Sequence, residues 1–467
     1  MEDSLYSRRA LYEKLPLPIR NGAGRILTAL PQRIRYGNFY SVYRRRIAEF
    51  LNAGDAWRSK GLQLCLLQQT VESAVRHVPF YKGGTPIRDY ADLKQFPIVS
   101  RNDYMGDIRA FTAEGLEGQA LACLTGGSCG NPMTFYVHKN MSRPKEKAHF
   151  HWFWGLHGYR PRNRILAIRG KPLRDNRLFD LQSLDNRLAV SCFELKDSNA
   201  HLVAAAVRRF NPEFVHAYPS SLKIFCQLLK DPDALGPMTG LRAILLSSEV
   251  LLEADETLFA EFFGVPVVTW YGQSECVLHG GYLPSSAKYH FFPFYGYLEL
   301  LDDHDNPITQ AGKVGRIVGT GFDNHVMPFL RYDTGDLGVL PSDTQETSAW
   351  NWPVLERIEG RAQDIIYLSD GNPVTLASFI AAQRLPQYAR IREMQVEQDT
   401  AGKLLMRIVK GAGFQLKDEV EMIAKLSNSV SPTVQISTEY VDRIPKTHRG
   451  KHIFLVQKMR DPNLRAR

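Results

Sequence analysis

The spacing of hydrophobic residues along the chain changes character more than once. The first hundred residues read as helical, and over residues 62–77 apolar positions recur with helical spacing until Pro79. After Leu121 the pattern becomes short apolar runs separated by amphipathic stretches. The runs cover residues 164–170, 214–220, 241–248 and 265–272. Such alternation is typical of βαβ crossovers, so we predict a mainly parallel sheet flanked by helices.

From Tyr289 onward the pattern favours strands, with antiparallel strands expected over residues 290–302 and 315–322. Beyond Gly360 the chain reads as a smaller α+β unit. Its strands are expected at residues 394–399, 404–410 and 434–441, around a helix near 418–427. The sequence therefore predicts an α/β N-terminal domain over residues 1–363, helical over about 1–100 and with a β-rich subdomain. A small, mobile α+β C-terminal domain is expected over residues 364–467.

Composition narrows the class of protein. A chain of 467 residues exceeds what one hydrophobic core usually supports, and 44% hydrophobic residues is ordinary for a globular enzyme. No apolar run approaches the roughly 18 residues that a membrane span needs. The first residues lack the layout of a secretory signal, so we expect a cytoplasmic protein. The six cysteines are scattered without a CxxC pair, which favours reduced thiols.

The net charge of +9 is concentrated at the N-terminus, where residues 1–50 hold ten Lys and Arg against four Asp and Glu. Such an excess favours anionic partners, so peripheral association with a membrane surface stays open beside a simple solvated basic face. The segment lacks the interleaved aromatic and basic residues of a single-strand binder. We therefore expect no nucleic-acid partner.

The strongest local motif is the glycine-rich stretch 125–132. Gly126, Gly127 and Gly130 let the backbone approach an anion, and Thr125 and Ser128 supply hydroxyl donors. The stretch lacks the Gly-Lys-Ser/Thr ending of a Walker loop. Phosphate binding and an ordinary tight turn are both open from the residues alone.

A second motif, residues 271–275, directly follows an apolar run. Glu275 at a strand end, beside the Ser274 hydroxyl, suits a Mg²⁺ ion near phosphates, because Mg²⁺ commonly takes only one or two protein carboxylates. From these residues alone, a turn with a solvated glutamate is the favoured interpretation.

Three further motifs follow in the second half of the chain. Asp336, within residues 331–337, could accept hydrogen bonds from both hydroxyls of a ribose, although a surface hairpin would look similar. Residues 360–364, which include Arg361, lie at the expected domain boundary. A hinge and a nucleotide contact could coincide there. Lys451 ends a glycine-bearing loop at 444–451, from which it could reach an active site or simply remain solvated.

The order and spacing of these five motifs resemble the adenylate-forming superfamily of acyl-CoA synthetases, adenylation domains and luciferases. Within it, the chain is most similar to the phenylacetate–CoA ligase-like branch, especially its CapK-like members from capsular polysaccharide biosynthesis. The resemblance covers nearly the whole chain. It is also carried by residues 77–81, 289–302, 318–322 and 324–336.

The resemblance implies a role for each motif. The loop holding the β- and γ-phosphates of ATP comprises Thr125, Gly126, Gly127, Ser128 and Gly130. The residues that flank the adenine are Ser248, Glu249, Tyr271 and Gly272. Ser274 would contact the α-phosphate and Glu275 would bind Mg²⁺. The ribose would be bound by Asp336 with Arg361, the hinge would lie at Asp364, and Lys451 would serve the adenylation step.

Some positions depart from the superfamily pattern. Met133 stands where many members carry lysine, and Cys129 where Thr or Ser is common. Some relatives hold zinc after the second motif. Cys276, His279 and His290 are nearby here, but no cysteine follows them, so we do not expect zinc.

The residues that select the acid are less clear. The aromatic segment 150–157 fits core packing better than a substrate wall. Residues 216–220, at the end of an expected strand, are the better pocket candidate. Neither segment identifies the acid.

The resemblance implies ATP- and Mg²⁺-dependent activation of a small-molecule carboxylic acid as an acyl-adenylate, with pyrophosphate release and acyl transfer. The acceptor would be a thiol (CoA or carrier-protein phosphopantetheine) or the amine or hydroxyl of a glycan or nucleotide sugar, in polysaccharide biosynthesis. An aryl-acid CoA ligase of the phenylacetate type is the alternative. A non-catalytic nucleotide-binding scaffold at a membrane-associated glycan assembly is the alternative from another class.

Overall fold

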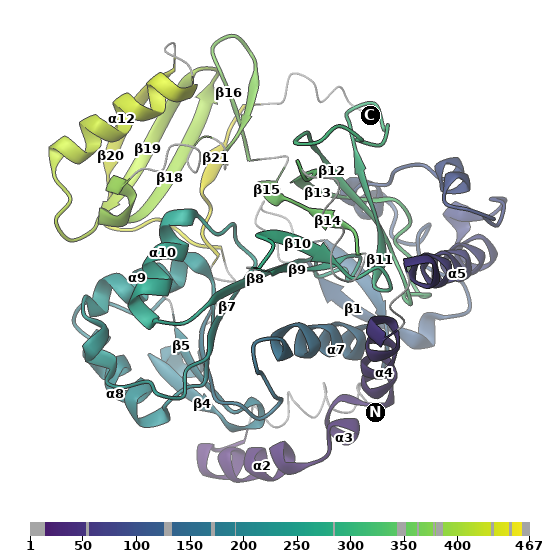
Figure 1. Cartoon of the computed structure of the whole chain (residues 1–467), viewed down its shortest axis with the longest axis horizontal. Coiled ribbons are helices and arrows are strands. Elements are labelled where there is room, and N and C mark those ends of the chain that lie inside the picture. The colour runs from purple at the N-terminus through teal and green to yellow at the C-terminus, as the bar shows by residue number, and fades with distance from the viewer. Residues whose placement is uncertain are drawn as a thin grey trace. The chain divides into compact units, whose positions relative to one another are not determined.

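The computed structural model describes residues 15–52, 56–125, 133–169, 173–191, 193–283, 285–342, 352–361, 364–376, 379, 386–430, 434–447 and 451–459 (Figure 1). The chain divides into two compact units. The first comprises Met1–Asn163, Leu181–Arg187 and Val268–Ile358, and the second comprises Arg164–Asp180, Leu188–Val267 and Glu359–Arg467. The predicted α/β fold class is confirmed. The predicted domain boundary between residues 363 and 364 stays a prediction.

Helices dominate the N-terminal part of the first unit. They are α2 (Leu17–Ala29), α3 (Gln32–Tyr36), α4 (Asn38–Asn52), α5 (Ala56–His77), α6 (Arg101–Gly106) and α7 (Ser142–Gly155), with 3₁₀ turns η1 (Pro79–Tyr81), η2 (Ala91–Gln95), η3 (Glu117–Gln119) and η5 (Ser183–Asp185). The helical pattern over 62–77 thus forms the last turns of α5, which ends before Pro79 because proline cannot donate to the helix ladder. At α6, Ser100 and Asp103 form a capping box.

The strands of the first unit are β1 (Ala120–Leu124), β2 (Thr134–His138), β8 (Val267–Gly272), β9 (His279–Leu283), β10 (Lys288–Phe291), β11 (Gly296–Leu301), β12 (Val314–Gly321), β13 (Tyr332–Val339) and β14 (Val354–Leu355). Strands β1 and β2 form a hairpin around the glycine-rich stretch. Strand β9 pairs antiparallel with β8 and β10, and β12 pairs antiparallel with β11 and β13. Residues 290–302 were expected as antiparallel strand and form two, because a turn at 292–295 interrupts them.

The first part of the second unit confirms the predicted crossovers. Strands β3 (Ile165–Arg169), β6 (Phe214–Ala217) and β7 (Ala243–Ser247) pair in parallel. The remaining elements are β4 (Phe179–Gln182), β5 (Arg187–Ser191), α8 (Ala200–Phe210), α9 (Pro219–Leu229), α10 (Glu253–Phe263) and the 3₁₀ turns η4 (Arg174–Asn176) and η6 (Pro232–Leu235). Leu166, Val215, Ile244 and Phe225 are fully buried in one core, as expected for a parallel sheet covered by helices.

The C-terminal part of the second unit is the predicted α+β unit. Its elements are β16 (Ile365–Tyr367), β17 (Pro373–Thr375), η7 (Pro386–Arg390), β18 (Ile391–Thr400), β19 (Lys403–Lys410), α12 (Leu416–Val430), β20 (Gln435–Tyr440) and β21 (Leu455–Gln457). The preceding strand β15 (Arg357–Arg361) begins in the first unit and ends in the second. Strand β19 pairs antiparallel with β18 and parallel with β20, and β21 pairs parallel with β18. Helix α12 lies along this sheet (Figure 1), and its Met422 and Leu426 are buried in the core with Met406 and Ile408.

Candidate active site

The predicted site residues fall into two groups, one in each unit. The first unit holds Thr125, Tyr271, Gly272, Ser274, Glu275 and Asp336. The second unit holds Ser248, Glu249, Arg361, Asp364 and Lys451. The remaining loop residues, Gly126, Gly127, Ser128 and Gly130, lie outside the described residues.

Glu275 lies in the turn that follows β8, and its side chain is 8% exposed. The Tyr332 hydroxyl donates a hydrogen bond of 3.0 Å to Glu275 Oε1. Burial raises the pKa of Tyr332 well above its usual value, and the neighbouring Glu275 raises it further, so the phenol stays neutral and donates. The turn itself is closed by Gln273, whose carbonyl accepts the Cys276 amide and whose side-chain oxygen accepts the Leu278 amide. Glu275 is therefore held in a defined position.

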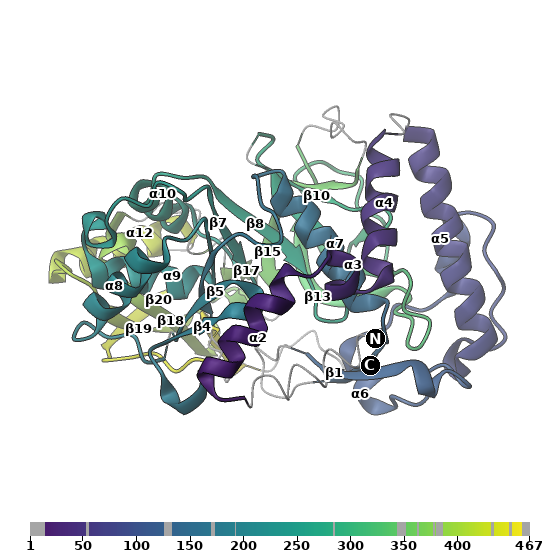
Figure 2. The same ribbon diagram turned by 90° about the horizontal axis from the view of Figure 1, so that it is seen from below.

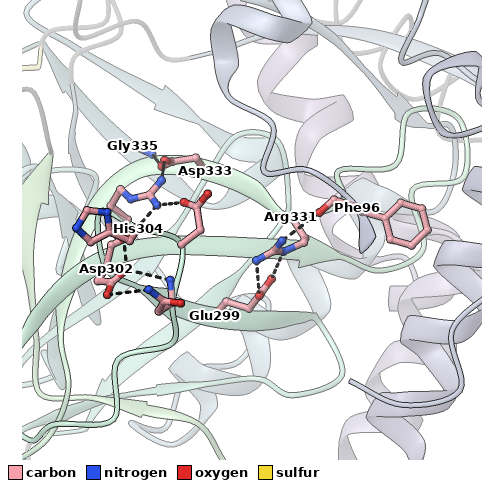
Figure 3. Close-up of polar contacts among 10 residues, drawn as sticks. Phe96, Glu299, Asp302, His304, Arg331, Asp333 and Gly335 are labelled. Carbon is pink, nitrogen blue, oxygen red and sulfur yellow. Dashed lines mark hydrogen bonds and ion pairs between the residues drawn. The ribbon is translucent and has the colours of Figure 1, made fainter. Parts of the chain in front are cut away.

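Arg331 fixes the start of β13, directly before Tyr332 (Figure 3). Its guanidinium donates to both carboxylate oxygens of Glu299, at 3.2 and 3.1 Å, and to the Phe96 carbonyl at 3.0 Å. Planar, two-point pairing of this kind sets orientation as well as distance. Arg331 also has a positive φ of 44°. A non-glycine residue with a positive φ raises the free energy of the folded protein unless surrounding contacts stabilise it. The buried ion pair with Glu299 is such a contact.

A second ion pair holds Asp333 (Figure 3), the residue that follows Tyr332 in the chain. Arg316 on β12 donates to Asp333 at 2.8 Å and to the Asp302 carbonyl at 2.9 Å, and it also contacts Asp305. The other Asp333 oxygen accepts the Gly335 amide at 2.9 Å. Both neighbours of Tyr332 in the chain are thus anchored, so the phenol is aimed at Glu275.

Asp336, on the same strand, accepts a hydrogen bond of 2.8 Å from the Tyr271 hydroxyl on β8. The Tyr271 hydroxyl also lies 3.3 Å from Thr334 Oγ1. Burial raises the pKa of Tyr271 well above its usual value, with Asp336 adding to the effect, so this phenol also stays protonated. Tyr271 precedes Glu275 by four residues, as Tyr332 precedes Asp336. The two tyrosine–carboxylate bonds therefore run in opposite directions between the same two segments, and we call this arrangement the crossed brace.

Thr125 forms the stem of the glycine-rich stretch. Its amide donates to the Met133 carbonyl at 2.9 Å, and its hydroxyl oxygen accepts the Met133 amide at 2.9 Å. A hydroxyl that accepts can still donate its own proton. Met133 is 1% exposed, so the residue standing in place of the common lysine belongs to the core.

In the second unit, Glu249 accepts hydrogen bonds on both carboxylate oxygens. Oε2 accepts the Ser220 amide at 3.0 Å, and Oε1 accepts the Ser220 hydroxyl at 3.1 Å and the His452 amide at 2.9 Å. His452 directly follows Lys451. The C-terminal lysine loop is thus bonded to the segment after β7 that was predicted to flank the adenine. Ser248 itself is exposed, with a positive φ of 71°.

The ends of the lysine loop are closed by the backbone. The Lys451 amide donates to Thr447 Oγ1 at 3.0 Å, and the Thr447 amide donates to the Lys451 carbonyl at 3.0 Å. On the N-terminal side, Lys446 pairs with Glu393 at 3.4 Å. On the C-terminal side, the His452 ring contacts the Met394 carbonyl through Nε2 at 2.6 Å. Both contacts anchor the loop to β18.

The hinge candidates are also in the second unit. The Asp364 amide donates to the Arg361 carbonyl at 2.9 Å, and the Asp364 carbonyl accepts the Leu376 amide at 2.8 Å. The role of Arg361 beside Asp336 stays a prediction, since the two residues belong to different units.

The aromatic helix α7 is largely packed into the first unit. His151 is buried and hydrogen-bonded to the Tyr40 hydroxyl at 2.9 Å, while Phe153 and Trp154 are also buried. Phe150 makes edge contacts with Trp270 and His279. The strand-end candidate is buried too, with His216 at 4% and Tyr218 at 6% exposure. Neither segment gains an assigned substrate contact.

Glu275 offers a single carboxylate to a metal ion, and His279 lies close by in sequence. Among the described residues, no group of three or more His, Cys, Asp or Glu is arranged to hold a metal. His279 is deeply buried, and burial lowers its pKa to about 3. One carboxylate beside nucleotide phosphates is sufficient for Mg²⁺, which keeps several waters. Magnesium binding at Glu275 stays a prediction.

Sequence reasoning missed the partners of the site. It singled out Glu275 and Asp336 but gave no role to Tyr332 or Thr334, although both lie in the 331–337 motif. It also gave no role to His452, whose backbone amide makes the bond to Glu249. A backbone contact leaves no signal in residue type, whereas a tyrosine inside a motif that already supplies an acidic ligand could have been considered.

Comparison with known proteins gives consistent results. Residues 366–458 match the family model described as the CapK C-terminal domain. Phenylacetate-coenzyme A ligase of Thermus thermophilus is 24% identical over 271 residues, which are 52% of this chain and 60% of that protein. The match thus spans less than two thirds of that relative.

Solved structures share the fold. 2-Hydroxyisobutyryl-CoA ligase in the postadenylation state, in complex with R3-HIB-AMP, superposes with a TM-score of 0.62 and 15% identity, over 85% of this chain and 89% of that chain. The anthranilate CoA ligase AuaEII in complex with anthranoyl-AMP gives a TM-score of 0.50 and 18% identity, over 71% and 65% of the two chains. None of the described helices is both long and apolar enough to cross a membrane. Residues 366–458 are thus similar to the CapK C-terminal domain, part of the chain is similar to a phenylacetate-coenzyme A ligase, and the fold is shared with solved CoA ligases.

Proposed function

We propose that this protein uses ATP and Mg²⁺ to activate a carboxylic acid. An oxygen of the acid attacks the α-phosphorus of ATP, the bond to the β-phosphate oxygen breaks, and pyrophosphate leaves with the bonding electrons. The mixed anhydride that remains is an acyl-adenylate. An acceptor then attacks the acyl carbon and AMP leaves. The observation that carries this proposal is the crossed brace, which orients Glu275 and Asp336 within one unit.

The two carboxylates of the crossed brace would meet different parts of a nucleotide, Asp336 the ribose and Glu275 the Mg²⁺ ion at the phosphates. Asp336 is proposed to accept hydrogen bonds from the ribose hydroxyls, beside the bond that its Oδ2 accepts from Tyr271. Glu275 is fixed by Tyr332 as a carboxylate ligand for Mg²⁺. When bound, this ion would neutralise phosphate charge. Ser274, next to Glu275, is proposed to donate to the α-phosphate, and Thr125 to the terminal phosphates together with the loop that follows it.

Lys451 is proposed to supply the cation for the adenylation step. Its ammonium would stabilise the charge that develops as pyrophosphate departs. The support is its position: the closed stem at Thr447 and the bond from His452 to Glu249 hold Lys451 next to the predicted adenine segment. Arg361 would contact the ribose, and Asp364 would be the hinge between two orientations of the small domain.

A thiol is the favoured acceptor, since the relatives named above are CoA ligases. CoA or carrier-protein phosphopantetheine would meet this need. Transfer to an amine or hydroxyl of a glycan or nucleotide sugar, in polysaccharide biosynthesis, is the alternative supported by the CapK-type C-terminal domain. Phenylacetate and other aryl acids are the first substrates to test. We also propose a cytoplasmic location, with association at a membrane surface.

The experiment is pyrophosphate release from ATP and Mg²⁺ across a panel of aryl, hydroxy and amino acids, with and without CoA. Acid-dependent release that Lys451→Ala lowers by about 10² or more would support adenylation. ATP binding without release for every acid would favour a non-catalytic nucleotide-binding scaffold instead. Pyrophosphate release that Lys451→Ala leaves unchanged would remove the lysine from the mechanism.

A further inference from the structure

Helix α2, drawn in Figure 2, turns a polar side toward the rest of the first unit and an apolar side away from it. The Thr28 hydroxyl contacts the Ser183 and Leu184 carbonyls at 2.9 and 3.0 Å, and the Ser183 hydroxyl donates to Asn21 at 3.0 Å. Asn21 and Thr28 are seven residues apart and therefore share one face. The side of α2 that packs against η5 is thus hydrogen-bonded and polar.

The opposite side is apolar and exposed. Ile19 is 59% exposed and Ile26 is 70% exposed, again seven residues apart, and Gly22 and Ala29 complete the stripe with helical spacing. Ile34 on α3, 52% exposed, follows shortly after it. We call Ile19, Ile26 and Ile34 the isoleucine ridge. A surface helix normally turns such residues toward the core, so the ridge points to a partner outside the described part of the fold.

The chain segment that carries the ridge has charges of one sign, although Asp185 on the neighbouring η5 is acidic. Residues 15–48 contain seven arginines and no Asp or Glu. Arg162 donates to the Thr28 and Ala29 carbonyls at 3.2 and 2.6 Å, which places its charge at the C-terminal end of α2. Arg35 donates to the Pro161 and Leu184 carbonyls nearby, and Arg33 is exposed one residue before Ile34. Aliphatic side chains bordered by guanidinium groups match a surface that is apolar beneath and anionic above.

We infer that the isoleucine ridge docks on a membrane surface rich in anionic phospholipid, with α2 lying in the plane of the headgroups. The apolar side chains enter the acyl boundary, and the neighbouring arginines meet phosphate oxygens. A second copy of the chain is a poorer partner, because self-association would bring two arginine clusters together. This contact needs no membrane-spanning helix. It would hold an acyl-transferring enzyme at the membrane surface, where a lipid-linked acceptor would be found.

The test is sedimentation of the full-length protein with vesicles of phosphatidylcholine alone, or mixed with phosphatidylglycerol. We expect binding to the mixed vesicles only, weakened by salt. Ile19→Asn combined with Ile26→Asn should lower the bound fraction at least about tenfold, since two buried aliphatic side chains are lost. The matched control is Leu416→Asn with Val420→Asn, a similarly exposed pair (70% and 60%) on α12, which should bind like the unchanged protein.

Three results would overturn the inference. The first is no binding of the unchanged protein to the mixed vesicles. The second is equal loss in the ridge variant and the α12 control, which would indicate general stickiness. The third is light scattering that shows a dimer dissociated by the ridge variant, which would make the ridge an interface between copies. Thermal melting of both variants checks that each is folded, and none of these readouts depends on the proposed enzymatic activity.

Discussion

The backbone amide of His452 donates a hydrogen bond of 2.9 Å to the carboxylate of Glu249, 203 residues away in the chain. Lys451 precedes His452, and Ser248 precedes Glu249, so this bond joins two predicted parts of the active site. The amide and the hydroxyl of Ser220 donate two further hydrogen bonds to the Glu249 carboxylate. We therefore expect Glu249 to position the lysine loop, since its carboxylate is already engaged by protein donors.

Glu249→Ala should slow pyrophosphate release more than it affects acyl transfer. A hydrogen bond to a charged group is worth about 1.5–3 kcal/mol, so we expect a loss of roughly 10- to 100-fold in kcat for adenylation. Transfer from a supplied acyl-adenylate should change little, because that step does not need Lys451 in this place. The exposed Glu253→Ala on α10 is the matched control. Equal losses in both half-reactions, or a raised KM for ATP with normal kcat, would argue against a positioning role.

Tyr332→Phe should weaken the response to magnesium without abolishing activity. The substitution removes only the hydroxyl that donates to Glu275, so the carboxylate stays but its orientation is less fixed. We expect half-maximal activity at a Mg²⁺ concentration about 3- to 10-fold higher, in line with one lost hydrogen bond. Glu275→Gln, which removes the proposed ligand itself, should cost about 10²–10³ in rate.

Tyr104→Phe is the control for this measurement. Tyr104 packs on the Tyr332 ring, and its own hydroxyl contacts the Pro328 carbonyl at 3.4 Å and the Tyr81 side chain, but not Glu275. A titration with Mg²⁺ at saturating ATP compares the three variants. If Tyr104→Phe and Tyr332→Phe shift the magnesium response equally, the effect comes from ring packing and the brace has no special role.

The other half of the brace predicts how the protein reads the ribose. Tyr271→Phe removes the 2.8 Å bond to Asp336 and should raise the KM for ATP by about 3- to 10-fold. Asp336→Ala should raise it further and also remove discrimination against 2′-deoxy-ATP and 3′-deoxy-ATP. Steady-state kinetics with the three nucleotides measures both effects. Retained discrimination in Asp336→Ala would place the ribose elsewhere.

The fold could be predicted from the sequence where the apolar residues follow one clear pattern along a segment. The buried parallel strands at 164–170, 214–220 and 241–248 were found because both faces of such strands are apolar, and they correspond to β3, β6 and β7. The segment 290–302 was harder, because Phe292, Phe294 and Tyr295 are buried within a turn and imitate a continuing strand. Residue type alone cannot distinguish a buried turn from a buried strand.

The residues of the candidate site also include some that could be predicted from the sequence and some that could not. Glu275 and Asp336 could be proposed because a carboxylate at a strand end has a chemical use. Their tyrosine partners lie more than fifty residues away, so the crossed brace depends on the register of β13 against the turn after β8. The reversed faces of α2 were also beyond sequence reasoning, since nothing in residues 17–29 states which side meets the protein.

The first unit should become less stable as the pH is lowered, because its buried histidines take up protons only when the protein unfolds. His279 is fully buried, and burial lowers its pKa from 6.5 to about 3, with Lys145 adding a smaller effect in the same direction. Between these two values the unfolded chain binds a proton that the folded protein does not, so unfolding becomes easier as the pH drops. The linkage amounts to about 2 kcal/mol between pH 7 and pH 5 for this one residue.

Urea unfolding of the unchanged protein and of His279→Leu at several pH values checks this. The variant should lose clearly less stability between pH 7 and pH 5, whatever its stability at pH 7, because its side chain no longer takes up a proton on unfolding. A residual slope of the same sign is expected from His149, whose ring lies 6.2 Å from that of His279 and whose pKa burial also lowers. Identical slopes for the two proteins would mean that His279 titrates normally in the folded protein, and the buried ring would then have to be reached by water.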